Sequence, residues 1–186
     1  MTRQNFLKTR LYCTAIIAIV IWSLLVWDHF HGGVPSHHIL HREDLPAFSN
    51  WWGGFLIPLL TWFLFSRIQG RISKNSALDT TIPANVFYGF LSALIFGILL
   101  SIFFTAGFEE LPLYMIIGLI LTSLFLPIYR AECFLGFVVG MIYTFGGVLP
   151  ILIVSILTLI GAILYLIVRS GVLFIILKVS NLKIIK

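Results

Sequence analysis

All five histidines of this chain lie between positions 29 and 41, and three of its seven acidic residues lie beside them. These acidic residues are Asp28, Glu43 and Asp44. Imidazole and carboxylate groups are the ligands of many catalytic zinc sites and of non-haem iron sites. A random scatter of five histidines over 186 residues would not concentrate them in this way. This segment is therefore the part of the sequence that most strongly suggests chemistry.

The local sequence predicts a short helix from His37 to Asp44. Ser36 is a favourable N-cap, and Pro46 disfavours helical conformation in the residue before it. On this helix His37 and His41 are four residues apart, and Asp44 follows His41 by three, so the three side chains share one face. We therefore predict that His37, His41 and Asp44 form the core of a divalent metal site. Zinc is favoured over iron as the metal.

Further ligands are available near this helix. His38 points about 100° away from His37, so it takes a secondary role. The secondary candidates for metal ligands are Asp28, His29, His31 and His38. Glu109 and Glu110 belong to the next outer loop and are candidates for an additional ligand or a catalytic general base.

Two other interpretations of the histidine segment stay open. Histidine and the neighbouring pair Trp51-Trp52 are amphipathic, and such side chains anchor helices at the membrane–water interface. Histidine also titrates near pH 6.5, so a cluster of them could sense acidification.

The composition identifies the kind of molecule that must position these residues. Hydrophobic residues make up 60% of the chain and charged residues 10%, with a mean hydropathy of +1.06. A soluble domain carries about 25% charged residues. A chain of this size cannot hide such an apolar excess from water, which excludes both a soluble globular fold and disorder. The chain is therefore an integral membrane protein.

The long apolar runs lack the alternation of a membrane β-barrel and predict helices. The predicted spans are Leu11–Trp27, Trp51–Ser66, Pro83–Ala106, Leu111–Tyr129, Cys133–Phe145 and Val148–Val168. The last two spans are short or tilted, and a re-entrant hairpin is the alternative. The predicted fold is an all-α, polytopic membrane bundle of about six transmembrane segments. Residues 1–186 form one domain with an ordered extracytoplasmic loop at residues 28–50.

The basic residues predict the orientation. With the N-terminus inside, only Arg42 of the twelve Lys and Arg residues falls outside, as the positive-inside rule requires. Asp79 and Glu132 are the acidic residues that fall in inner loops. Both termini are therefore predicted to be cytoplasmic, in a multi-pass protein of the plasma (inner) membrane. The net charge of +5 suits anionic lipid head groups, so membrane lipids and not nucleic acid are the expected partners.

No motif in the sequence names a reaction. The HExxH, GxSxG, P-loop and GxGxxG patterns are absent. No ionisable residue falls near the centre of a predicted span, which disfavours ion-coupled transporters. The pair Gly136 and Gly140, four residues apart, predicts close helix packing or self-association into a homo-oligomer.

Three functions are compatible with these features. The first is a membrane metalloenzyme acting on a lipidic or apolar substrate, a hydrolase with zinc or an oxidoreductase with iron. The second is a non-catalytic subunit or scaffold of a membrane complex. The third is a metal-handling or pH-sensing membrane protein.

Overall fold

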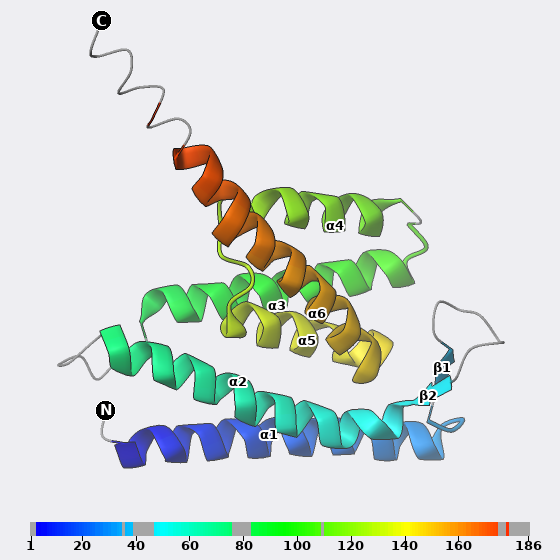
Figure 1. Cartoon of the computed structure of the whole chain (residues 1–186). Helices are drawn as coiled ribbons and strands as arrows, with labels where there is room; N and C mark the ends of the chain where they lie inside the picture. The colour runs from blue at the N-terminus through cyan, green and yellow to red at the C-terminus, as the bar shows by residue number, and fades with distance from the viewer. Residues whose placement is uncertain are drawn as a thin grey trace, which may run out of the picture.

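The computed structural model describes residues 3–34, 36–38, 47–75, 83–108, 110–174 and 178. Within this part of the chain, six helices account for most of the residues (Figure 1). They are α1 (Arg3–Phe30), α2 (Gly53–Asn75), α3 (Ala84–Thr105), α4 (Leu111–Thr122), α5 (Ala131–Phe145) and α6 (Val148–Ile163). Each predicted span overlaps one of them. An apolar run folds in this way because a helix satisfies its backbone hydrogen bonds within the segment.

Among the residues that the structure describes, three helices are long and apolar enough to cross a membrane. They cover Phe6–Phe30, Ala84–Thr105 and Val148–Phe174. The last of these is α6 continued through the π-helical turn η3 (Leu164–Val168). By contrast, α4 and α5 have 12 and 15 residues, which gives lengths of roughly 18 and 23 Å. The hydrocarbon core of a bilayer is about 30 Å thick.

The predicted span Leu111–Tyr129 is wrong in its second half. The helix α4 ends at Thr122, and residues 123–130 form turns. Pro127 disfavours helical conformation in the residue before it. In addition, the Ser123 hydroxyl donates to the carbonyl oxygen of Ile120 at 2.6 Å, which gives the backbone an alternative partner at this point.

Consecutive helices run in opposite directions, so the bundle is an up-and-down arrangement (Figure 1). The helices α1 and α2 lie side by side, as do α3 and α5. The start of α1 and the described end of α6 lie toward the same end of the molecule, on the left in Figure 1. The loop that leaves α1 and the start of α2 lie at the opposite end.

The closest helix pair is α3 with α5, and glycines make the approach possible. A Cβ atom on Gly140 would lie 2.5 Å from the carbonyl oxygen of Leu94, and one on Gly136 would meet the carbonyl oxygen of Phe90. On the facing helix, a Cβ on Gly97 would lie 2.8 Å from the Phe137 carbonyl oxygen. The prediction of close packing at Gly136 and Gly140 is thus confirmed, with α3 of the same chain as the partner.

The core of the bundle surrounds α5, which packs against α2, α3 and α6. Val138 on α5 and Ile57 on α2 have no exposed surface, and Met141 is 1% exposed. Apolar side chains on the outer faces of α1 and α6, such as Ile19 and Leu159, are largely exposed. This is the pattern of a membrane bundle, in which lipid covers the outward apolar faces.

Candidate functional site

The loop with the histidines begins where α1 ends. Gly32 and Gly33 have φ angles of +117° and +95°, which side chains other than glycine rarely adopt. The carbonyl oxygen of Asp28 accepts from the amide groups of His31 at 3.1 Å and Gly33 at 2.9 Å. The two glycines therefore end the helix.

The predicted helix from His37 to Asp44 is wrong at its start. Ser36–His38 is a strand, β1, paired antiparallel with β2 (Ala47–Ser49), and His37 lies opposite Phe48 in the register. An isolated helix of eight residues is marginal, whereas the ladder satisfies backbone groups of both segments. The shared helical face of His37, His41 and Asp44 therefore no longer follows from their spacing.

Several predicted site residues lie outside the described residues. They are His41, Asp44 and Glu109. For His37 and His38 the structure describes the backbone only. The metal site built on these side chains thus stays a prediction. Among the residues that the structure describes, no three His, Cys, Asp or Glu side chains come together in a group that could hold a metal ion.

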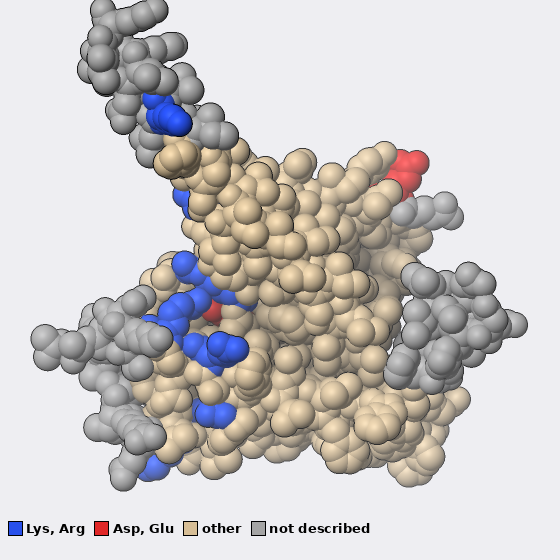
Figure 2. Space-filling model, in the orientation of Figure 1, with Lys and Arg blue, Asp and Glu red and all other residues tan. Residues whose placement is uncertain are grey.

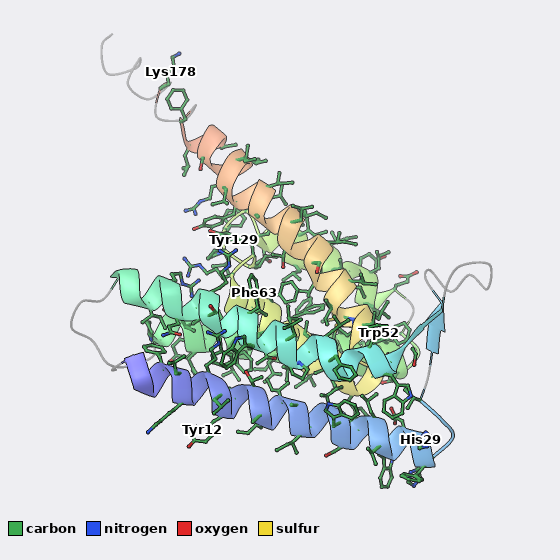
Figure 3. All side chains as sticks on the ribbon, turned by 60° about the horizontal axis from the view of Figure 1, so that its bottom comes forward. Tyr12, His29, Trp52, Phe63, Tyr129 and Lys178 are labelled. Carbon is green, nitrogen blue, oxygen red and sulfur yellow. The ribbon has the colours of Figure 1, made fainter. Side chains whose placement is uncertain are left out.

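His29 and His31 are both exposed, and both contact aromatic rings. The His31 ring stacks on Trp27 with centroids 3.8 Å apart, and the His29 ring meets the edge of Trp51 at 6.0 Å. The Nδ1 atom of His31 also lies 2.9 Å from the carbonyl oxygen of Trp27. In the neutral tautomer with its hydrogen on Nδ1, the ring donates this bond and the Nε2 lone pair is available as a ligand. His29 and Trp52 lie near the same end of the bundle (Figure 3).

Glu110 belongs to the same end of the molecule. It precedes α4, is exposed, and its Oε2 atom accepts from the Tyr114 hydroxyl at 3.3 Å. Figure 2 shows acidic atoms at the end opposite to the basic side chains, and a smaller acidic area among the basic side chains.

The base of the histidine loop is fixed to the turn between α5 and α6. Asn50, at the start of the short helical turn η2 (Asn50–Trp52), is 3% exposed. Its side chain fills the space where a Cβ on Gly146 would lie, and Gly146 has a φ of +69°. Beside it, a Cβ on Gly53 would lie 3.0 Å from the Cα of Gly147. Trp51 then packs 6.0 Å from the ring of Trp22 on α1.

At the other end of the bundle, the structure shows a buried ion pair that the sequence analysis missed. Glu132 was assigned to an inner loop, but it lies in the first turn of α5 and is 1% exposed. Its Oε1 atom accepts from Nη2 of Arg71 on α2 at 2.6 Å. Gly89 on α3 leaves the space that the Glu132 side chain occupies. The available signal was an acidic residue within a basic region, directly before an apolar run.

Comparisons with protein-family models, curated proteins and solved structures found no match to this chain. Function is therefore inferred from the side chains and their geometry.

Proposed function

We propose that the chain spans the inner membrane six times, with both termini in the cytoplasm and the histidine loop outside. The basic side chains gather at one end of the molecule (Figure 2), at the start of α1, the end of α2, the start of α5 and the end of α6. Those that the structure describes are Lys8, Arg10, Arg67, Arg71, Arg130, Arg169 and Lys178. This segregation supports the orientation because basic residues are retained on the cytoplasmic side.

The shortness of α5 is compatible with six spans. Protein covers most of this helix, because α2, α3 and α6 pack against it, although Tyr143 is 86% exposed. Irregular backbone at its two ends can therefore lie at membrane depth without facing hydrocarbon. Of the last two predicted spans, α5 is accordingly a central helix. The other, α6, is peripheral and, with its continuation to Phe174, is long enough to cross a membrane.

For the outer end we propose a divalent metal site in the histidine loop. The observation that carries this proposal is the hydrogen bond between Nδ1 of His31 and the carbonyl oxygen of Trp27. Metal-ligating histidines commonly donate one ring N–H to a backbone carbonyl, which fixes the tautomer and leaves the other nitrogen for the metal. This bond supports His31 as a ligand. We propose that it acts with His37, His41 and Asp44, which the sequence suggests as the other ligands.

The closure of the loop favours such a site. Its two ends are held together by the contact between His29 and Trp51 and by the pairing of β1 with β2. A loop whose ends already meet loses less conformational entropy when a metal orders it. Zinc is favoured over iron, although imidazole and carboxylate ligands suit both metals and only the coordination geometry separates them.

At the membrane surface, zinc held by these residues would supply activation of water for hydrolysis of a lipidic substrate, and iron would supply oxidation chemistry. Glu110 is the described candidate for a general base at this end. A non-catalytic subunit of a membrane complex is the alternative without metal. A metal-handling or pH-sensing protein is the alternative without catalysis.

Elemental analysis of the purified full-length protein, with and without chelator, tests the metal site. We expect stoichiometric metal in the wild type and its loss in His31→Ala and His41→Ala, because each removes a ligand. Trp27→Leu is the matched control, since it removes the ring that stacks on His31 but keeps the backbone carbonyl. It should retain metal. Unchanged metal content in both histidine variants, or no metal in the wild type, would leave interfacial anchoring as the explanation.

A further inference from the structure

A cavity of about 330 Å³ lies near the basic end of the bundle, between α1, α2, α3 and α5. Its walls are mostly apolar and include Phe6, Ile17, Ile68, Val86, Phe90 and Leu135. Two of its lining residues are charged, Glu132 on α5 and Arg10 on α1. The cavity is independent of the histidine loop, which lies at the other end of the molecule.

Glu132 has one oxygen committed and one available. Oε1 accepts from Arg71, but Oε2 is buried and has no hydrogen-bond partner among the described residues. An unpaired acceptor buried in this way costs free energy that a ligand with a hydrogen-bond donor would recover. A ligand in this cavity with a hydrogen-bond donor group near Oε2 of Glu132 would therefore be favoured.

Arg10 presents the complementary requirement. Its guanidinium carbon lies 3.6 Å from the ring centroid of Trp62 on α2, a cation–π contact that fixes the position of the charged group. Its Nε atom is buried and has no hydrogen-bond partner in the described part of the chain. This nitrogen is a donor, so it needs an acceptor.

A hydroxyl group offers both functions, because it has one donor hydrogen and two acceptor lone pairs. An anionic phosphate would bring like charge to the free oxygen of Glu132, and an ammonium would bring like charge to Arg10. The volume is at the lower end of the ~300–1,000 Å³ usual for ligand pockets, which fits one chain better than two. We propose that this cavity binds a membrane amphiphile with a single hydrocarbon or isoprenoid chain and a hydroxyl group as its polar end.

The test uses the full-length protein in nanodiscs with a photoreactive dodecanol that carries a diazirine in its chain. Competitors are dodecan-1-ol, farnesol, dodecyl methyl ether and dodecyl phosphate. The ether accepts a hydrogen bond but cannot donate one, so it should compete at least about tenfold less well than the alcohol, the loss expected for a hydrogen bond to a charged group. The relative competition by dodecan-1-ol and farnesol distinguishes a preference for a linear alkyl chain from a preference for an isoprenoid chain.

Two filling variants locate the site. Val86→Phe places a larger side chain in this cavity, whereas Val154→Phe does the same in a second apolar cavity of about 370 Å³ between α3, α4, α5 and α6. The two valines are matched, at 6% and 5% exposed. We expect Val86→Phe to abolish photolabelling and Val154→Phe to leave it unchanged.

Glu132→Leu tests the polar contact and should remove the preference for alcohol over ether. If this variant does not fold, the competitor series on the wild type still decides the ligand class. Equal competition by alcohol and ether, stronger competition by dodecyl phosphate, or labelling that only Val154→Phe abolishes would each overturn the proposal.

Discussion

At the scale of single residues, the pair Arg71–Glu132 has two unequal partners. The Arg71 side chain is 31% exposed and that of Glu132 is 2% exposed. Removing the arginine leaves a carboxylate buried without its counter-charge. Removing the acid leaves an arginine that water and lipid head groups can reach. The cost of breaking a buried ion pair therefore depends on which partner remains.

We expect Arg71→Met to lower the free energy of unfolding by about 3–5 kcal/mol, the usual cost of stranding a buried charge. Glu132→Gln should cost clearly less. Unfolding in mixed micelles with increasing SDS measures both. The matched control is Arg67→Met on the same helix, where an exposed arginine lies 5.2 Å from the Phe63 ring, so that its loss should cost at most about 1 kcal/mol. Equal losses for Arg71→Met and Arg67→Met would contradict this account of the pair.

At the scale of elements, the short distance between α3 and α5 depends on glycines whose neighbours are backbone atoms. A change of side-chain rotamer could not make room for a larger residue there. A methyl group on Gly140 would meet two backbone atoms of α3, the Leu94 carbonyl oxygen at 2.5 Å and the Ile98 nitrogen at 3.0 Å. The helices would have to move apart along their whole contact, because the interior is close-packed.

Gly140→Ala should therefore destabilise the protein by about 1–3 kcal/mol or more, as overpacking does. Gly118→Ala on α4 is the control, since a Cβ there has nothing within 4 Å, and it should be neutral or slightly stabilising because alanine favours helix over glycine. Thermal unfolding in detergent measures both variants. A neutral Gly140→Ala would show that α3 and α5 are not in this contact in the membrane.

The element scale also shows where sequence reasoning succeeded and failed. All six apolar segments contain helices, because hydropathy alone makes an internally hydrogen-bonded helix favourable. The segment from His37 was predicted as helix from its N-cap and spacing, but a strand forms because a partner segment, Ala47–Ser49, lies within reach. The ion pair of Glu132 escaped notice because its partner is 61 positions away in the sequence.

At the scale of the whole molecule, the histidine end and the basic end should face opposite sides of the membrane. In a background where the free cysteines Cys13 and Cys133 are replaced by alanine, we expect Ser36→Cys to react with an impermeant maleimide on intact cells. Lys178→Cys at the other end should react only after permeabilisation. The reverse pattern would show that the orientation is inverted. Labelling of both positions in intact cells would show that they lie on the same side, so the chain would not cross the membrane six times with both termini inside.

The sequence by itself determined the helical segments and their apolar, membrane-compatible character, since each of these depends on the local composition of one segment. The tertiary structure alone decided that Gly136 and Gly140 meet α3, that Asn50 fills the space at Gly146, and that Glu132 is buried beside Arg71. These contacts join segments that are distant in the sequence. Which faces meet is set by packing between helices, and hydropathy says nothing about it, because lipid and protein cover an apolar face equally well.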